Sequence, residues 1–210
     1  MAQATQQIDI VLFDLGGVLV ELTGVPTFLG WLDQQCSADD LWHRWLHSPA
    51  VRRFELGRSS AEEFAQEIVK EFTLPVPVDT FLAEFTVWPR NLYPGVIPLL
   101  DRLSATHTLA CFSNNNVLHW DRICTGMGLG RYFTHHFASH LIGYLKPDRE
   151  AFEFVRDALG CPAGHILFLD DNRLNVEAAR DVGMQARRTV GFDEVPGALA
   201  EFGILLPSIH

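Results

Sequence analysis

The chain has 210 residues, of which 48% are hydrophobic and 20% are charged, and its formal net charge is −10 at pH 7. These proportions are typical of a soluble globular protein with a substantial core, and the length suits one large domain or a core with an insertion. The acidic balance disfavours nucleic acid as a partner, and no apolar stretch approaches the roughly 20 residues of a membrane span.

The N-terminus, MAQATQQIDI, lacks the basic start and the apolar stretch of a secretory signal. The four cysteines, Cys36, Cys111, Cys124 and Cys161, are scattered, and their spacing is not that of a zinc site. We therefore expect free thiols in a reducing cytoplasm. The sequence does not distinguish a monomer from a homodimer.

Three short, continuously apolar segments bounded by turn residues predict buried strands, and two weaker segments predict further strands. In chain order the strong segments are 8–14, 107–113 and 165–171, and the weak ones are 135–139 and 184–190. Helical patterns lie between them at 96–103, 117–127, 148–159 and 176–182. This alternation predicts an α/β fold, a Rossmann-like doubly wound parallel sheet with helices on both faces.

The segment from residue 22 to residue 88 has no convincing strand and several helical patterns, at 27–35, 38–47, 50–56 and 60–72. The pair Ser59 and Glu62, or the pair Ser60 and Glu63, can form a capping box at the last of these helices. We predict two domains. Residues 1–21 and 89–210 form an α/β core domain, and residues 22–88 form a helical bundle inserted after the first strand.

Polar side chains follow each of the three strongest predicted strands. Asp14 follows the first strand, residues 113–116 (SNNN) follow the second, and Asp170 and Asp171 end the third, while Lys146 precedes a predicted helix start. Each feature alone is typical of a turn or a helix cap. Because ligands of open parallel sheets bind outside the carboxyl ends of the strands, their combination predicts one functional site.

Phosphoryl transfer through an aspartate is the chemistry that needs this set of side chains. A carboxylate such as Asp14 attacks phosphorus and forms an acyl phosphate. Several carboxylates would repel an anionic substrate unless a hard divalent cation, preferably Mg²⁺, lay among them. Lys146 would neutralise further charge, and Ser113 with nearby backbone N–H groups would hold phosphoryl oxygens.

Four motifs in this order resemble those of the haloacid dehalogenase superfamily of phosphohydrolases. They are FDLGGVL (13–19), the serine of FSNN (112–115), the lysine of GYLKPDREAF (143–152) and FLDDNRLNVEAARDVGM (168–184). The long interval between the first two leaves room for a helical cap domain. GRSSAEEF (57–64) resembles the start of a cap helix in the subfamily with the small helical cap.

The resemblance implies a role for each residue at the strand ends. Asp14 would be the nucleophile and, with the backbone carbonyl of Gly16 and with Asp171, a ligand of Mg²⁺. Asp170 would act at the metal site more indirectly, through water or Lys146. The implied catalytic residues are Asp14, Ser113 and Lys146; the implied substrate-binding residues are Ser113, Asn114, Asn115 and Lys146; the implied metal site is Asp14, Gly16, Asp170 and Asp171.

Gly16 departs from the family pattern, in which an aspartate two residues after the nucleophile protonates the leaving oxygen and then activates water. Glycine can do neither, and losing a general acid–base group costs about 10²–10⁴ in rate. SNNNVLH (113–119) resembles a bacterial branch that includes phosphatases acting on hexose 1-phosphates such as α-glucose 1-phosphate. We hypothesise that His119 or Asn115 replaces part of the missing function.

Three functions remain open at this point. The favoured one is a Mg²⁺-dependent phosphatase of a small phosphorylated metabolite, with sugar 1-phosphates among its candidate substrates. The second is a 2-haloacid dehalogenase, which uses the same nucleophile without the second aspartate, although the acidic pair Asp170 and Asp171 argues against it. The third is a catalytically weak binding protein, although buried carboxylates are costly without a cation.

Overall fold

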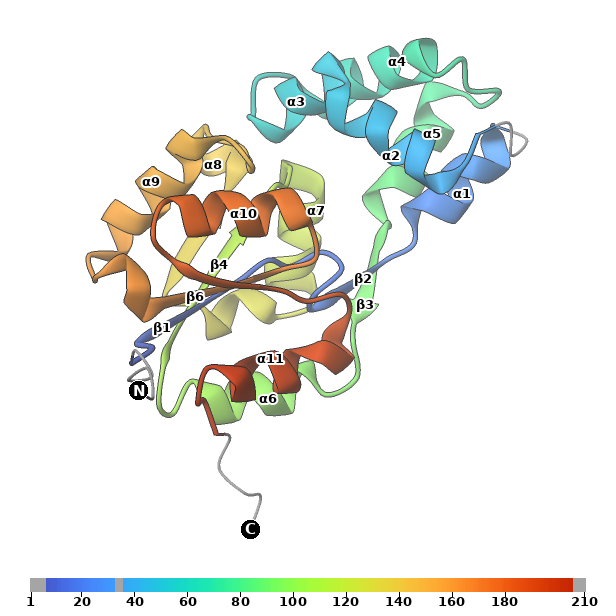
Figure 1. Cartoon of the computed structure of the whole chain (residues 1–210). Helices are drawn as coiled ribbons and strands as arrows, with labels where there is room; N and C mark the ends of the chain where they lie inside the picture. Colours follow the sequence, from blue (N-terminus) through green and yellow to red (C-terminus); the bar gives the residue numbers. More distant parts are fainter. Residues whose placement is uncertain (1–6, 33–35, 206–210) are drawn as a thin grey trace.

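The computed structural model describes residues 7–32 and 36–205, and it consists of an α/β core and a separate group of helices joined by a short β-ribbon (Figure 1). The core sheet has five parallel strands in the order β5-β4-β1-β6-β7. Their bounds are Ile10–Phe13 (β1), Thr108–Ser113 (β4), His135–Ala138 (β5), Ile166–Asp170 (β6) and Gln185–Arg188 (β7). The prediction of a doubly wound parallel sheet is confirmed.

Helices cover both faces of this sheet. One face carries α6 (Val96–Leu103), α7 (Val117–Asp121), which continues as a π-helical turn over Arg122–Gly126, and α11 (Val195–Glu201). The other face carries α9 (Arg149–Leu159) and α10 (Arg173–Asp181), and α8 (Ser139–Ile142) follows β5. Short 3₁₀ turns span Leu129–Tyr132, Ala163–His165 and Phe192–Glu194.

The central strand β1 shows why its sequence is continuously apolar. Val11 and Phe13 point into the apolar cluster on one face of the sheet, and Ile10 and Leu12 point into the cluster on the other. Successive side chains of a strand alternate between faces, so a strand covered on both sides needs an apolar residue at every position. β1 therefore lies at the centre of the core, and Asp14 comes directly after its buried end.

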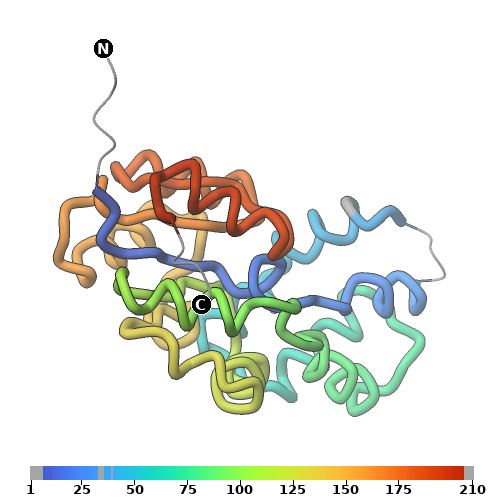
Figure 2. Tube along the Cα trace, turned by 90° about the horizontal axis from the view of Figure 1, so that it is seen from below, coloured from blue at the N-terminus to red at the C-terminus, as the bar shows by residue number. Residues whose placement is uncertain are grey.

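The helical region, residues 22–88, is reached through a two-stranded antiparallel ribbon of β2 (Val20–Leu22) and β3 (Pro89–Leu92). Its helices are α1 (Gly24–Trp31), α2 (Ala38–His47), α3 (Pro49–Glu55), α4 (Ala61–Glu71) and α5 (Val78–Thr86). They enclose an apolar cluster of their own, in which Phe28, Phe64 and Phe81 are fully buried. Seen from below, the region extends to one side of the core (Figure 2).

Several elements differ from the sequence prediction. The helix expected at 27–35 is α1, which begins at Gly24, and residues 33–35 lie outside the described residues. Helix α5 was not predicted, because the prolines before it conceal a helix start at which Pro77 occupies the N-cap. The strands of the ribbon were also missed, since they are only three and four residues long and β3 begins with a proline.

Local capping interactions determine where α4 and α10 begin. Of the two capping boxes considered, the structure forms the one between Ser60 and Glu63. Helix α10 begins at Arg173, three residues before the expected position, because the Asn172 side chain accepts a hydrogen bond from the Leu174 N–H at 2.9 Å. No helix among residues 7–32 and 36–205 is long and apolar enough to cross a membrane.

Candidate active site

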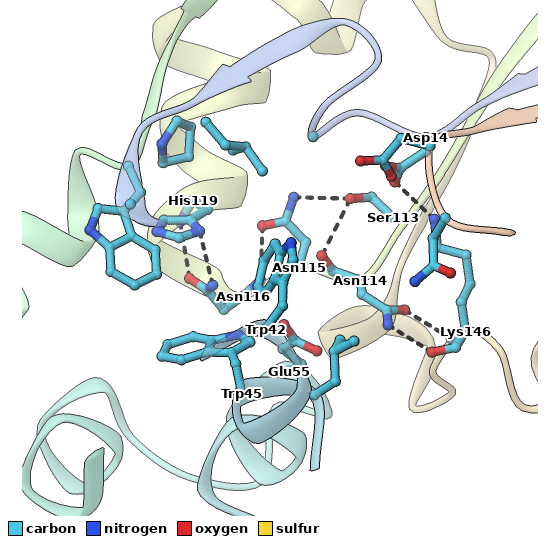
Figure 3. Close-up of a pocket in the computed structure, with 18 of the residues that line it drawn as sticks. Asp14, Trp42, Trp45, Glu55, Ser113, Asn114, Asn115, Asn116, His119 and Lys146 are labelled. Carbon is cyan, nitrogen blue, oxygen red and sulfur yellow. Dashed lines mark hydrogen bonds and ion pairs between the residues drawn. The ribbon is translucent and has the colours of Figure 1, made fainter. Parts of the chain in front are cut away.

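A cavity of about 190 Å³ lies at the carboxyl ends of the core strands, between the sheet and the helical region (Figure 3). The structure brings most of the sequence-predicted residues to its wall; these are Asp14, Gly16, Ser113, Asn114, Asn115, Lys146 and Asp171. Asp170 is fully buried beneath them. The helical region supplies the opposite wall with Trp42, Trp45, Leu46, Glu55 and Phe85.

Lys146 is buried, and its ammonium group links the carboxyl ends of three core strands, β1, β4 and β6. Its Nζ donates to Asp14 Oδ1 at 2.8 Å, to Asp170 Oδ2 at 2.6 Å and to the Phe112 carbonyl at 2.9 Å. Burial alone would lower the pKa of Lys146, but attraction by Asp14 and Asp170 outweighs it and the pKa lies above its ordinary value. The lysine is therefore charged, and each of its three N–H groups donates to a defined acceptor.

Asp170 is saturated with donors. Besides Lys146, its carboxylate accepts from the Asn172 N–H at 2.8 Å and from Asn175 Nδ2, which lies 3.0 Å from each oxygen. An oxygen pair with this many donors has little capacity left for a direct metal bond. Asp170 therefore contacts Lys146 directly, and its action through the lysine stays a prediction.

Asp14 and Asp171 have free coordinating capacity. Oxygens of Asp14, Asp170 and Asp171 lie within 4.8 Å of one another. Burial raises the pKa of Asp14 to about 7, with Lys146 opposing the rise and the neighbouring aspartates adding to it. Burial likewise raises the pKa of Asp171 to about 6, with added repulsion from Asp170.

This donor set fits a divalent cation. Three carboxylates face one ammonium group, so negative charge is in excess, and hard oxygen ligands suit Mg²⁺. The carbonyl of Gly16, which lines the same cavity, accepts no hydrogen bond from the described residues. Asp14, Asp171 and this carbonyl are the groups that would hold the ion.

Gly17 makes the close approach of Asp171 possible. Its φ is +74°, and a Cβ at this position would lie 2.5 Å from Asp171 Oδ2. A side chain would therefore be strained by its backbone and would collide with the carboxylate. The two adjacent glycines of the first motif thus differ, since Gly16 lines the cavity and Gly17 leaves space for Asp171.

The amides after β4 position other groups. Asn115 donates from Nδ2 to Ser113 Oγ at 3.5 Å and accepts the Asn116 N–H at 2.9 Å. Asn114 donates from Nδ2 to the Lys146 carbonyl at 2.8 Å and accepts the Lys146 N–H at 2.9 Å. The Asn114 side chain is thus engaged in positioning Lys146, and its second Nδ2 proton and its backbone N–H are the donors left for the predicted contact with phosphate.

His119 does not have the geometry of an acid–base group. Its Nε2 donates to the Phe85 carbonyl at 2.7 Å, its Nδ1 accepts from Asn116 Nδ2 at 3.2 Å, and its ring stacks on Phe85. Burial lowers the pKa of His119 to about 4. Both nitrogens are occupied in the neutral form, so His119 joins α7 to α5 and the hypothesis that it replaces the missing aspartate loses its support.

Glu55 is a site residue that the sequence analysis missed. It ends α3 and reaches the cavity from the helical region, facing Asn114 and Asn115 across it in Figure 3. Burial raises the pKa of Glu55 to about 7; Lys146 and Arg52 oppose the rise, and Asp14 adds to it. The available signal was its place one helical turn after the buried Val51, on the face of α3 that turns inward.

The sequence is similar to those of known phosphatases. The chain is 28% identical over 185 residues to a phosphoglycolate phosphatase of Pseudomonas syringae pv. tomato, an alignment that covers 83% of this chain and 66% of the relative. It is 25% identical over 189 residues to the D-ribitol-5-phosphate phosphatase of Bacteroides thetaiotaomicron, covering 83% and 88%. The chain thus spans slightly less than two thirds of the length of the phosphoglycolate phosphatase.

Solved structures show the same fold at lower identity. A HAD family enzyme from Bacteroides thetaiotaomicron, solved with magnesium and inorganic phosphate, matches with a TM-score of 0.70 at 21% identity, covering 86% of this chain and 93% of that one. An L-2-haloacid dehalogenase from Xanthobacter autotrophicus matches with a TM-score of 0.60 at 20% identity, covering 87% and 78%.

The family model for haloacid dehalogenase-like hydrolases matches residues 8–183, which include the first three motifs, the fourth as far as Gly183, and every residue of the candidate site. The match therefore extends through the core on both sides of the helical region. The chain belongs to the haloacid dehalogenase-like hydrolase family.

Proposed function

We propose that the protein is a Mg²⁺-dependent phosphatase that hydrolyses a small phosphorylated metabolite through an aspartyl-phosphate intermediate. The observation that carries the proposal is the arrangement of Asp14, Lys146 and Asp171. Lys146 binds one oxygen of Asp14 at 2.8 Å and leaves the other oxygen for attack, and an oxygen of Asp171 lies within 4.8 Å of an Asp14 oxygen, close enough for both carboxylates to hold one cation.

In the proposed reaction each residue has a separate task. Asp14 attacks phosphorus and expels the alcohol, and water then releases phosphate and restores the carboxylate. Lys146 holds Asp14 in place and offsets negative charge, and Ser113 and adjacent backbone N–H groups bind phosphoryl oxygens. A bound Mg²⁺ would supply charge neutralisation and polarise the phosphoryl group.

The helical region would act as the cap of this site. It closes the cavity with apolar side chains, among them Trp42, Trp45 and Phe85. Excluding water strengthens the electrostatic interactions within and protects the intermediate from side reactions. We therefore keep the division into a core of residues 1–21 and 89–210 and a cap of residues 22–88.

The relatives indicate the substrate class. Their names specify phosphoglycolate and D-ribitol 5-phosphate, both small phosphate monoesters. A cavity of about 190 Å³ suits molecules of that size, and sugar 1-phosphates remain candidates. All four cysteines are free thiols, which supports the cytoplasm as the location.

A dehalogenase is the second candidate function. The dehalogenase from Xanthobacter autotrophicus shares the fold, which alone does not transfer activity. The cluster of Asp14, Asp170 and Asp171 favours the phosphatase, since attack on carbon needs no cation. Release of halide from 2-chloropropionate in the presence of EDTA would reverse this preference.

The test is phosphate release from a panel of esters, namely p-nitrophenyl phosphate, phosphoglycolate, ribitol 5-phosphate, glucose 1-phosphate and glucose 6-phosphate. We expect hydrolysis with Mg²⁺, none after EDTA, and none with Asp14→Asn. Asp101→Asn, at an exposed position of α6, is the matched control and should retain activity. Activity in Asp14→Asn, or activity without a divalent cation, would overturn the mechanism.

A further inference from the structure

Glu55 is a carboxylate that the helical region contributes to the cavity, and the mechanism so far does not use it. It forms no hydrogen bond or ion pair with the residues that the structure describes, although Lys146, Arg52 and Asp14 all act on it electrostatically. Glu55 is half-buried, so its carboxylate lies in the wall of the cavity, partly open to water, with no donor from the described residues attached to it. Its position therefore indicates a partner that arrives with the substrate.

The residues around Glu55 hold it over the core. On one side, Arg52 forms an ion pair with Asp148, the N-cap residue of α9. On the other side, a Cβ on Gly57 would lie only 2.8 Å from the His140 carbonyl of α8, so the chain touches the core there as well. The end of α3 is thus fixed at both flanks of Glu55.

The position of Glu55 matches the path of a leaving group. In phosphoryl transfer the attacking and leaving oxygens lie roughly in line on opposite sides of phosphorus. Asp14 attacks from the tip of β1, so the leaving oxygen departs toward the helical region. Figure 3 shows Glu55 on that side, with Ser113 and Asn114 between it and Asp14.

We propose that Glu55 is the general acid and base of the reaction and supplies from the helical region the function that Gly16 cannot provide. The inference rests on the proposed phosphatase function. In the first step an Asp14 oxygen bonds to phosphorus, the phosphorus–oxygen bond to the substrate breaks, and the leaving oxygen takes the proton of Glu55 and departs as an alcohol.

The second step returns Glu55 to its starting state. Its carboxylate accepts a proton from water while the water oxygen bonds to phosphorus, and the bond to Asp14 breaks with its electron pair returning to the carboxylate. The products are an alcohol and inorganic phosphate, and both Glu55 and Asp14 are regenerated. The raised pKa of Glu55 agrees with a group that holds a proton in one step and releases it in the next.

The structure has room at Gly16 for the aspartate of the family pattern, whose function we assign to Glu55. The three heavy atoms nearest to a Cβ there all belong to the Leu22 side chain, with its terminal Cδ1 at 2.9 Å, and the backbone of Gly16 is not in the left-handed region. An aspartate at position 16 can therefore be accommodated by a small shift of Leu22. This provides a rescue experiment.

The decisive measurement compares leaving groups. Native protein and Glu55→Gln are assayed with Mg²⁺ on p-nitrophenyl phosphate, whose leaving group needs no proton, and on the fastest alkyl ester of the panel above. We expect Glu55→Gln to lower kcat/KM for the alkyl ester by about 10²–10⁴ and to change kcat/KM for p-nitrophenyl phosphate by less than about threefold. Turnover of p-nitrophenyl phosphate should become biphasic, with a burst of p-nitrophenol, because the second step lacks its base.

The controls separate this role from folding and from simple binding. Glu62→Gln removes an exposed carboxylate of α4 and should behave as native protein, and the thermal unfolding midpoint of Glu55→Gln should stay close to the native one. Gly16→Asp in the Glu55→Gln background should restore alkyl ester hydrolysis by at least about tenfold.

Two results would overturn the role of Glu55 alone, provided that the native protein is active and Asp14→Asn is not. One is an equal loss on both esters, which indicates ordinary substrate binding, and the other is no loss on either. Failure of the native protein to hydrolyse any alkyl ester would also exclude it. Absence of hydrolysis of every ester would instead overturn the phosphatase proposal and this inference with it.

Discussion

The side chain of Asn114 brackets the backbone of Lys146, donating to its carbonyl at 2.8 Å and accepting from its N–H at 2.9 Å. The two residues lie 32 positions apart in sequence, at the end of β4 and in the loop before α9. This pair of hydrogen bonds fixes the loop so that the lysine side chain reaches between Asp14 and Asp170. The position of the ammonium group thus depends on a side chain that does not touch it.

Asn114→Ala should release this loop. We expect the free energy of unfolding to fall by about 1–3 kcal/mol, because two buried backbone groups of Lys146 lose their partners. Phosphatase activity should fall with it, and Asn114→Asp, which keeps the acceptor but not the donor, should be intermediate. Urea unfolding together with the p-nitrophenyl phosphate assay tests this, and native stability in Asn114→Ala would contradict it.

Lys146→Met should destabilise the fold as well as abolish activity. Without the ammonium group, the buried carboxylates of Asp14 and Asp170 lose the cation that lies between them, at a cost of about 3–5 kcal/mol at neutral pH. Protonation of Asp14, whose pKa burial already raises to about 7, relieves the repulsion between the two carboxylates, so the stability deficit should shrink as the pH falls from 7 to 5. Urea unfolding at both pH values measures it, with the exposed Lys70→Met as control; a deficit independent of pH would be inconsistent with this account.

Gly17→Ala should damage the metal site more than the fold. Its φ of +74° and the φ of +69° at Gly128 make alanine similarly strained at both positions, by about 1–2 kcal/mol. Only at Gly17 would the new methyl group meet Asp171, at 2.5 Å, whereas nothing lies within 4 Å at Gly128.

The comparison of Gly17→Ala with Gly128→Ala therefore isolates the collision with Asp171. We expect a similar loss of stability in both variants. The increase in melting temperature on adding Mg²⁺ should disappear only in Gly17→Ala, since a ligand stabilises the fold in proportion to its binding. An equal rise in melting temperature with Mg²⁺ in both variants would show that Asp171 is not a ligand of the metal.

The neutral His119 makes stability depend on pH. Its pKa lies at about 4 in the folded protein and at 6.5 as a free side chain, so the unfolded chain binds the extra proton between these values. The stabilisation is fully present above pH 6.5 and is lost as the pH falls toward 4, by about 3 kcal/mol in total. Urea unfolding of His119→Gln over this range should show a shallower loss than native protein, and identical slopes would refute the assignment.

The sequence was most informative where chemistry and local structure coincide. Asp14, Lys146 and Asp171 follow apolar strands or precede a helix start, and a parallel sheet necessarily brings such positions to one edge. Glu55 was missed because its helix lies in another part of the chain and contributes to the site only by packing on α8 and α9. Local patterns do not encode contacts of that kind.

The absence of a local signal for long-range contacts also explains why the expected roles of Asn114 and His119 differ from those in the structure. Asn114 and His119 stand in a motif rich in polar residues, and composition alone does not show which of them faces the substrate. Their partners, Lys146 and Phe85, are 32 and 34 residues away in sequence. The fold of the core could be predicted because alternation of strands and helices is a local signal, whereas the short ribbon of β2 and β3 carries too few residues to give one.

The ribbon of β2 and β3 makes the strand order of the sheet independent of the helical region. The chain enters the helical region after Leu22 and leaves it at Pro89, and these two residues are paired across the ribbon. Paired residues of antiparallel strands lie only about 5 Å apart, a gap that a tight turn spans. The order of the core strands is therefore independent of the length and composition of what lies between them, so replacement of the entire segment would change the wall facing the substrate while leaving the aspartates and the lysine in register.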